Sequence, residues 1–365
     1  MPRQTVATVV GTRPQFVKAS AMSRELRKSF DEVLIHTGQH YDYMMSTAFF
    51  EELPLPAPDY NLEVGSGTHG RQTGRMLERL EGLLMHVRPS LVIVYGDTNS
   101  TLAGALAATK LEIPVAHIEA GVRSFDRTMP EEHNRVLTDH LSSRLFVPTE
   151  LAVGHLSQEG ITEGVVLSGD VMCDALLEAR SQASRRRQGL LRKWGVEEGQ
   201  YVLATVHRAA NTDDVTALVS IMEGLALATL PIVFPCHPRT LKALSFEQFA
   251  GRQHVHIIEP LSYLDMLAAE EGAAVIATDS GGVQKEAYML GVPCVTLRNS
   301  TEWMETVEAG WNRVVGTDPS AIAEALQAFR PTGAREEVFG GGQAAALIAE
   351  NLASYLQYDL KEASL

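Results

Sequence analysis

Short apolar runs alternate with longer amphipathic segments along almost the whole 365-residue chain. The short runs are rich in Val and Ile and are bounded by Gly, Pro or Asp, which is typical of strands buried on both faces. The longer segments have the apolar spacing of helices. This alternation predicts parallel sheets of right-handed βαβ units, with helices on both faces. The predicted strands are 5–10, 32–36, 90–95, 115–119 and 144–148 in the first half, and 201–206, 232–235, 255–258, 274–278 and 294–297 in the second.

The strand–helix pattern restarts after Ser168-Gly169-Asp170. Since one hydrophobic core stops growing at about 250–300 residues, a chain of this length predicts two domains or one large one, and the restart of the pattern favours two. We therefore expect an α/β protein with two doubly wound, Rossmann-like domains, residues 1–168 and 169–341. A final helical segment, residues 342–365, could pack on either of them.

The chain has 31 Lys and Arg against 45 Asp and Glu, a formal net charge of −14. This balance argues against a general nucleic-acid binder, which shows a basic stripe. No run approaches the roughly 18 apolar residues that a membrane-spanning helix needs, and no signal-peptide pattern precedes the first predicted strand. The three cysteines are far apart and odd in number, which predicts reduced thiols. We therefore expect a cytoplasmic protein that binds neither nucleic acid nor membrane.

Ligands of open α/β sheets bind beyond the carboxyl ends of the strands. The first predicted strand is followed by Gly11-Thr12-Arg13-Pro14, with Lys18 one turn into the next helix. Glycine allows close approach of the backbone, a helix start offers free N–H groups, and Arg13 can bind two phosphate oxygens. A plain strand–helix turn with a surface arginine is an equally good interpretation. The motif is neither GxGxxG nor a Walker loop, so it gives no support to a nicotinamide cofactor or Mg-ATP.

The second half contains another junction of strand, glycines and helix, at Asp279-Ser280-Gly281-Gly282. Its shape suits a diphosphate, and Glu286, one helical turn further, could accept both hydroxyls of a ribose. The alternative is a helix-capping serine with an incidental glutamate. His207 follows another predicted strand and could donate a hydrogen bond to a phosphate or to a leaving oxygen.

Three acidic residues follow strands of the first half: Asp97, Glu119 and, on a loop before Asn134-Arg135, Glu131. Strand ends bring such groups together in space. Clustered carboxylates move each other's pKa values apart, which supplies one acid and one base near neutral pH. Asp97 could instead cap a helix, its most frequent use. The histidines and cysteines show no recurring ligand spacing, so we expect no metal site.

Taken together, these motifs resemble the non-hydrolysing UDP-N-acetylglucosamine 2-epimerase family over roughly residues 4 to 355. Each motif is weak alone, but so many in one order are specific. The motifs are Gly11-Thr12-Arg13-Pro14 with Lys18, Gln39-His40, Gly96-Asp97-Thr98, His117-Ile118-Glu119-Ala120-Gly121 with Arg123, Pro130-Glu131-Glu132 with Asn134-Arg135, Pro148-Thr149-Glu150, His207-Arg208, and Thr278-Asp279-Ser280-Gly281-Gly282 with Gln284 and Glu286.

The resemblance implies a glycosyltransferase-B-like (GT-B-like) fold with a UDP-sugar in the interdomain cleft, the last helix returning to the first domain, and a homodimer. It implies an isomerase that interconverts UDP-GlcNAc and UDP-ManNAc without NAD, metal or any other cofactor, by elimination of UDP to a 2-acetamidoglucal and re-addition. The implied catalytic residues are Asp97, Glu119 and Glu131 as acid/base groups, with His207 and Lys18. The implied UDP-sugar-binding residues are Arg13, Lys18, Arg135, His207, Ser280, Gly281, Gly282 and Glu286.

Some positions depart from the family pattern. Ala209 stands where many members have a second Arg after His-Arg, Asp42 follows the Gln-His segment, and Trp303 replaces the Arg of an Arg-Pro-Glu run. These departures put an allosteric UDP-GlcNAc site in doubt. The run Thr301-Glu302-Trp303, together with the segments 11–16 and 36–42, also resembles epimerases of UDP-2,3-diacetamido-glucuronate. That activity, a hydrolysing epimerase that releases ManNAc and UDP, a GT-B glycosyltransferase and a non-catalytic UDP-sugar-binding protein stay open as alternatives.

Overall fold

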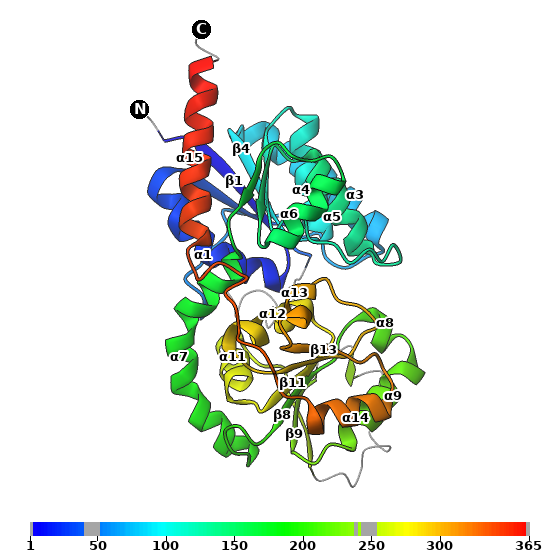
Figure 1. The fold of residues 1–365 in the computed structure, drawn as a ribbon. Helices are drawn as coiled ribbons and strands as arrows, with labels where there is room; N and C mark the ends of the chain where they lie inside the picture. Colours follow the sequence, from blue (N-terminus) through cyan, green and yellow to red (C-terminus); the bar gives the residue numbers. More distant parts are fainter. Residues whose placement is uncertain (1–2, 40–51, 237–239, 242–253, 363–365) are drawn as a thin grey trace. The chain divides into compact units, whose positions relative to one another are not determined.

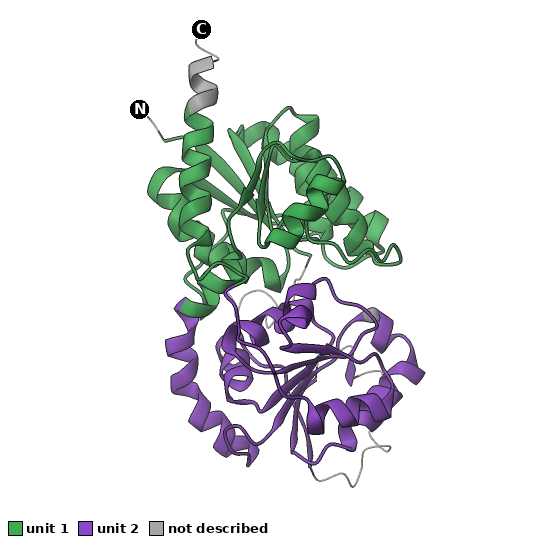
Figure 2. Cartoon of the chain, in the orientation of Figure 1, with its two compact units in different colours: residues 1–177, 338–365 green, residues 178–337 purple. Residues whose placement is uncertain are grey.

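The computed structural model describes residues 3–39, 52–236, 240–241 and 254–362. The chain forms two compact units, shown in different colours in Figure 2. Unit 1 comprises Met1–Leu177 and Val338–Leu365, and unit 2 comprises Glu178–Glu337. The domain boundaries that the sequence predicts, after residues 168 and 341, stay predictions.

Unit 1 is built on a parallel sheet with the strand order β3-β2-β1-β4-β5-β6-β7 in its described part. All five strands predicted for this half are present, and two short strands, β3 and β7, add to its edges. The bounds are β1 Thr5–Val10, β2 Asp31–His36, β3 Tyr60–Asn61, β4 Leu91–Tyr95, β5 Val115–Ile118, β6 Arg144–Val147 and β7 Val165–Leu167. The long predicted strands are buried because helices cover them.

Helices pack against the sheet of unit 1. One core cluster joins strand residues to the apolar stripe of α3, which includes Met76, Leu80 and Leu84. The C-terminal helix α15 packs along α1 (Figure 1), and α7 carries the chain from unit 1 into unit 2. The helices are α1 Arg13–Ser29, α3 His69–Val87, α4 Asn99–Lys110, α5 Pro130–Leu141, α6 Glu150–Gln158, α7 Val171–Trp194 and α15 Ala344–Glu362.

Unit 2 has a second parallel sheet, with the order β10-β9-β8-β11-β12-β13 among the residues described. Its strands are β8 Val202–Thr205, β9 Ile232–Pro235, β10 Val255–Ile258, β11 Val275–Thr278, β12 Cys294–Thr296 and β13 Asn312–Val314. Its helices are α8 Ala209–Thr212, α9 Val215–Ala226, α11 Tyr263–Gly272, α12 Gly281–Leu290, α13 Met304–Glu308 and α14 Pro319–Ala328. Two separate core clusters, one with Ile221 and Ile322 and one with Trp194 and Met266, join the sheet to different helices.

The two sheets share the doubly wound order of a Rossmann-like fold, in which the chain reverses its winding direction at one point in the sheet. This point lies between β1 and β4 in unit 1 and between β8 and β11 in unit 2. The predicted α/β class is therefore confirmed. Loops that follow β1 and β4, and those that follow β8 and β11, emerge at the positions where such sheets bind ligands.

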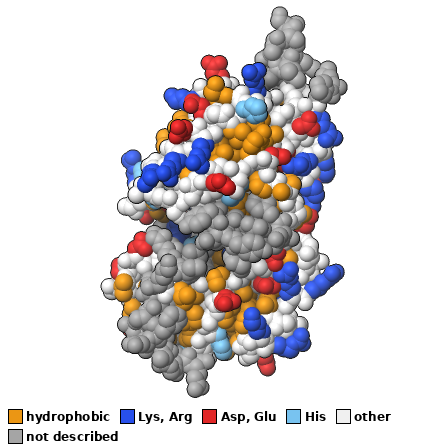
Figure 3. Space-filling model, turned by 180° about the vertical axis from the view of Figure 1, so that it is seen from behind, with side chains coloured by type: hydrophobic (Ala, Val, Ile, Leu, Met, Phe, Trp, Pro, Cys, Tyr) orange, Lys and Arg blue, Asp and Glu red, His pale blue; other side chains and the backbone are white. Residues whose placement is uncertain are grey.

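The surface carries charges of both signs, and none of the helices described is long and apolar enough to cross a membrane. On the face drawn in Figure 3, acidic and basic side chains are interspersed rather than collected into one basic stripe.

Candidate functional site

In unit 1, the loop between β1 and α1 leaves no room for a side chain at Gly11. A Cβ on Gly11 would lie 2.2 Å from both Ser100 Oγ and Thr37 Oγ1. The Gln15 side chain closes the turn, because its Oε1 accepts a 2.8 Å hydrogen bond from the Gly11 N–H and its Nε2 donates to the Tyr95 carbonyl at 2.8 Å. Arg13 is therefore set as the first residue of α1 on a rigid turn, with a partly exposed side chain.

Lys18 and Glu119 meet over Gly96, the residue before Asp97. The Lys18 ammonium forms an ion pair with the Glu119 carboxylate, and their side chains are only 7% and 12% exposed. An ideal Cβ on Gly96 would lie 3.3 Å from Lys18 Nζ and 3.8 Å from Glu119 Oε2. Glu119 has φ = +73°, a conformation that costs a non-glycine residue about 1–3 kcal/mol and that collects at functional sites.

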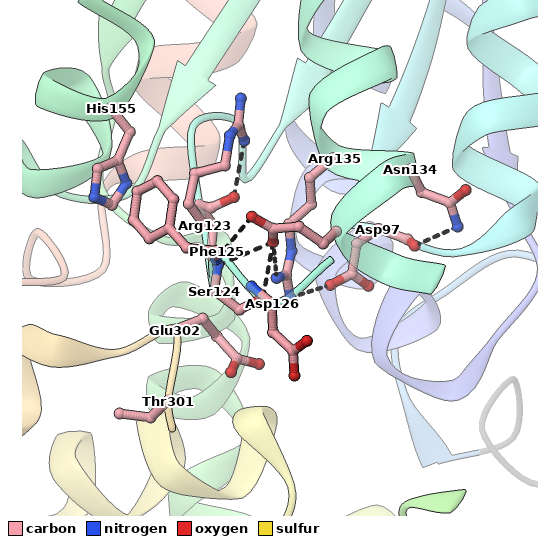
Figure 4. Close-up of polar contacts among 12 residues, drawn as sticks. Asp97, Arg123, Ser124, Phe125, Asp126, Asn134, Arg135, His155, Thr301 and Glu302 are labelled. Atoms are coloured by element: carbon pink, nitrogen blue, oxygen red, sulfur yellow. Dashed lines mark hydrogen bonds and ion pairs between the residues drawn. The ribbon is translucent and has the colours of Figure 1, made fainter. Parts of the chain in front are cut away.

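Helix α5 fixes Asp97 through two successive residues (Figure 4). Arg135 donates to the Asp97 carboxylate at 2.5 Å, and Asn134 Nδ2 donates to the Asp97 backbone carbonyl at 2.9 Å. The Asp97 side chain remains 29% exposed, whereas that of Arg135 is 4% exposed. A carboxylate that is oriented by hydrogen bonds and partly exposed to solvent can accept or deliver a proton in a fixed direction.

Two consecutive glutamates in the first turn of α5 behave differently. Glu132 is buried and accepts hydrogen bonds from the Ser124 N–H and Oγ and from the Phe125 N–H, all at 2.9 Å, while Arg135 contacts it at 3.0 Å. Glu131 is partly exposed, and its side chain makes no hydrogen bond or ion pair with the residues that the structure describes. Glu132 thus holds Arg135 in place for Asp97, and Glu131 stays available for chemistry.

The pKa of Glu132 predicts acid sensitivity of unit 1. Burial opposes its ionisation, but the hydrogen bonds from Ser124 and Phe125 and the charge of Arg135 outweigh this, so its pKa lies below the ordinary value of 4.5. A carboxyl group with a lowered pKa stabilises the folded state above its unfolded pKa of about 4.3, and this stability is lost as the pH falls through the lowered value.

Glu132→Gln should therefore be less stable than the unaltered protein at pH 7, and the difference should shrink below about pH 4.5. Urea unfolding followed by far-UV circular dichroism at pH 7 and pH 3.5 measures this. A difference in the free energy of unfolding that is equal at both pH values would contradict the expectation. The exposed Glu81→Gln is the matched control, since it removes a carboxylate from unit 1 without removing a buried contact.

The sequence reasoning missed a buried charge network behind these residues. Asp139 on α5 contacts His117 Nδ1 at 2.6 Å and the Arg123 guanidinium at 2.7 Å. Arg123 also forms two hydrogen bonds of 2.8 Å with Glu159. The one signal in the sequence was a histidine inside the apolar strand 115–119, because a polar residue at a buried strand position needs a partner.

In unit 2, Asp279 organises the loop after β8. Its carboxylate is fully buried and accepts hydrogen bonds from the His207 N–H at 3.1 Å, the Arg208 N–H at 3.0 Å and Asn211 Nδ2 at 3.0 Å. The His207 side chain itself is 44% exposed. Asp279 thereby joins the ends of β8 and β11, and it holds His207 and Arg208 at the mouth of this sheet.

The glycine junction of unit 2 leads into α12 as predicted. Ser280 caps the helix by accepting a hydrogen bond from the Val283 N–H. A Cβ on Gly281 would lie 2.5 Å from Glu302 Oε1, so any larger residue here would displace the Glu302 carboxylate. Glu302 is buried and pairs with Arg208 at 3.2 Å and Arg298 at 2.8 Å.

The predicted site residues thus fall into two groups, one in each unit. Those of unit 1 lie in the first turns of α1, after β4 and β5, and in α5: Arg13, Lys18, Asp97, Glu119, Glu131 and Arg135. Those of unit 2 lie at the ends of β8 and β11 and in the first turns of α12: His207, Ser280, Gly281, Gly282 and the buried Glu286. His40 and Asp42 lie outside the described residues.

Metal-binding side chains do not cluster in the described parts of the chain: no group of three or more His, Cys, Asp or Glu there could hold an ion. The basic residues of unit 1 instead contact carboxylates, as Lys18 does with Glu119 and Arg135 does with Asp97. The arrangement can therefore move protons between carboxylates and an adjacent ligand, using the basic residues to hold negative charge.

Comparison with known proteins adds independent findings. The sequence model of the family described as UDP-N-acetylglucosamine 2-epimerase matches residues 24–353. A UDP-N-acetylglucosamine 2-epimerase homolog from Methanococcus maripaludis is 50% identical over 352 residues, covering 95% of this chain and 99% of that protein. The UDP-2,3-diacetamido-2,3-dideoxy-D-glucuronate 2-epimerase of Pseudomonas aeruginosa is 45% identical over 358 residues, covering 95% and 99%.

Solved structures agree with the sequence comparisons. The crystal structure of Methanocaldococcus jannaschii UDP-GlcNAc 2-epimerase in complex with UDP-GlcNAc and UDP has a TM-score of 0.90 and 44% identity, and the match covers 96% of this chain and 99% of that one. The calicheamicin glycosyltransferase CalG4 has a TM-score of 0.58 at 13% identity, which shows likeness of fold alone. The GT-B-like fold expected from the sequence is thereby confirmed.

Proposed function

Because this chain belongs to the UDP-N-acetylglucosamine 2-epimerase family, we propose that it is an isomerase that interconverts UDP-GlcNAc and UDP-ManNAc. The observation that carries the proposal is that Asp97 and Glu119, which follow β4 and β5, lie beside Lys18 of α1 around Gly96. Inversion at C2 requires a proton to leave one face of the sugar and another to arrive on the opposite face. At least two acid/base groups are needed for this, and unit 1 offers three carboxylates.

The reaction we propose is an elimination followed by re-addition. A carboxylate takes the proton from C2, the C–H electron pair forms the C1=C2 double bond, and the C1–O bond breaks with its electrons passing to the diphosphate oxygen. The products of this half-reaction are 2-acetamidoglucal and UDP. Re-addition of UDP at C1, with protonation of C2 from the other face, gives the epimer. We assign the acid/base roles to Asp97, Glu119 and Glu131.

Cleavage of the C1–O bond to UDP must accompany removal of the C2 proton, because a C2–H beside an acetamido group is a very weak acid. We propose that Lys18 acts near the reacting centre and that Arg13 and Arg135 bind the substrate. His207 and the N-terminus of the ten-residue helix α12, with Ser280, Gly281 and Gly282, would hold the diphosphate. Glu286, one turn into α12, would accept the ribose hydroxyls. Charge that grows on the leaving diphosphate is then stabilised by groups that are already oriented.

A second candidate substrate is UDP-2,3-diacetamido-2,3-dideoxy-glucuronate. It is favoured by the 45% identity to the Pseudomonas aeruginosa enzyme over nearly the full length of both chains. Trp303, which replaces an Arg in the pattern of the UDP-GlcNAc enzymes, is buried against the Lys285 ammonium at 4.2 Å from the ring centroid. The chemistry at C2 is the same for both sugars, so the proposed catalytic roles do not depend on this choice.

Proton NMR in D2O tests the proposed function. We expect the protein with UDP-GlcNAc to introduce deuterium at C2 and to produce an anomeric signal of UDP-ManNAc. The same experiment with the diacetamido-glucuronate substrate compares the two candidates through their kcat/KM values. No C2 exchange with either sugar would refute the epimerase proposal, and accumulation of free ManNAc would show a hydrolysing enzyme instead.

We also propose a cytoplasmic homodimer. Support for the compartment comes from the three cysteines, Cys173, Cys236 and Cys294, which are buried and form no disulfide within the described part of the chain, as in proteins of reducing compartments. The dimer rests on the family resemblance alone, and light scattering of the purified protein measures it directly.

A further inference from the structure

The buried histidine of β5 has no place in the proposed reaction, yet it contacts the backbone beside the reacting carboxylates. We infer that His117 is a positioning residue, held as a doubly protonated imidazolium, that fixes the Gly96 carbonyl and thereby aims Asp97. The inference rests on the proposed function, because it explains how the acid/base carboxylates of unit 1 are kept in place.

Both ring nitrogens of His117 face an oxygen atom. His117 is completely buried. Its Nδ1 lies 2.6 Å from the Asp139 carboxylate, and its Nε2 lies 2.7 Å from the Gly96 carbonyl oxygen. A carbonyl oxygen can only accept, so Nε2 carries a proton. If Asp139 is ionised, it too can only accept, and both ring nitrogens must then donate.

The surroundings of Asp139 favour its ionised form. Besides His117, its carboxylate accepts a hydrogen bond from the Gly121 N–H at 3.0 Å and contacts the Arg123 guanidinium at 2.7 Å. Burial opposes ionisation, but the neighbouring groups prevail and hold the pKa of Asp139 below its ordinary value. The Gly121 N–H and the Arg123 guanidinium favour the carboxylate whichever charge His117 carries.

Four charged groups from three segments therefore face one another. The network contains the cations His117 and Arg123 and the anions Asp139 and Glu159, so its charges cancel. Such cancellation is the condition under which buried charges are tolerated. Lys18 and Glu119, which meet over Gly96, form the next ion pair on the side of the candidate site.

The backbone carbonyls of Gly96 and Asp97 are both held by side chains. Gly96 has φ = +60°, and its carbonyl is held by His117 from β5. The next carbonyl, that of Asp97, is held by Asn134 from α5 at 2.9 Å. The peptide groups on both sides of the Asp97 Cα are therefore anchored. The same Asp139 carboxylate that contacts His117 also holds the Gly121 N–H, two residues after Glu119 with its left-handed backbone.

A pair of amide substitutions separates positioning from simple packing. In His117→Gln the longer side chain can place its NH2 where Nε2 was, and it keeps the donor to Gly96. In His117→Asn the NH2 takes the place of Nδ1, which keeps the donor to Asp139 and loses the one to Gly96. Both variants leave Asp139 with the donors Arg123 and Gly121.

We expect His117→Asn to lower kcat for C2 exchange by about 100-fold, the effect of misplacing a reacting group by about 1 Å. Its KM should stay within threefold of that of the unaltered protein, and His117→Gln should recover at least tenfold of the lost kcat. Equal kcat values for the two variants, or a loss that appears in KM rather than kcat, would overturn the positioning role.

Nitrogen-15 NMR of the unaltered full chain with labelled histidine measures the charge state without substrate and without any variant. We expect a buried histidine whose two ring nitrogens both carry protons at pH 7.5, and whose signals disappear in His117→Gln. A ring with one unprotonated nitrogen would overturn the inference. Failure of C2 exchange in the unaltered protein would refute the proposed function instead, so the two failures are distinguishable.

Discussion

Asp97→Asn should lower kcat for C2 exchange by about 10³-fold, while the dissociation constant for UDP changes by less than threefold. The substitution keeps the size of the side chain, and its carbonyl oxygen can still accept the hydrogen bond from Arg135. It removes the ability to take up a proton, and general acid–base catalysis contributes about 10²–10⁴-fold to rates. Deuterium incorporation followed by NMR gives kcat, and calorimetric titration with UDP gives the dissociation constant.

Glu131→Gln provides the companion measurement, because Glu131 is the carboxylate of α5 that its neighbours leave available. It should also lose turnover and keep UDP binding. The control is Glu81→Gln on the exposed side of α3, which removes the same charge and should leave both quantities unchanged. Unchanged kcat in both Asp97→Asn and Glu131→Gln would remove these two residues from the mechanism.

Asp279→Ala should be the most damaging single change in unit 2. It leaves the His207 and Arg208 N–H groups and the Asn211 amide without their acceptor. A donor that loses its partner in a buried position costs about 1–3 kcal/mol, so we expect a loss of about 3 kcal/mol or more in the free energy of unfolding. Affinity for UDP should fall as well, because the loop that holds His207 is released.

Tryptophan fluorescence during urea unfolding measures the stability of unit 2 separately from that of unit 1. All three tryptophans belong to unit 2: Trp194, Trp303 and Trp311. Asp279→Asn is the matched variant: it retains one carbonyl acceptor and should lose less stability. Asp318→Ala removes an exposed cap of α14 and should cost about 1 kcal/mol. If Asp279→Ala were no more damaging than Asp318→Ala, the organising role of Asp279 would be wrong.

Much of the fold could be predicted from the sequence because its signals are local. The alternation of short apolar runs with helical segments identified ten of the thirteen strands described, each from a predicted run of four or more residues, and their parallel arrangement. The two short edge strands of unit 1, Tyr60–Asn61 and Val165–Leu167, were missed because two or three residues are too few to show a period. In unit 2, β13 at Asn312–Val314 escaped for the same reason.

The sequence also determined which residues could reach a ligand, because strand ends can be located from the pattern and parallel strands end at one edge of their sheet. Asp97, Glu119 and the 279–282 junction were found in this way. The partner of each residue was decided only by the tertiary structure. Glu132 rather than Glu131 supports Arg135, and His117 finds Asp139, 22 residues away, on a helix packed against its strand. Such contacts depend on the register of the strands and on how each helix packs against its sheet, and neither is encoded in any short stretch of the chain.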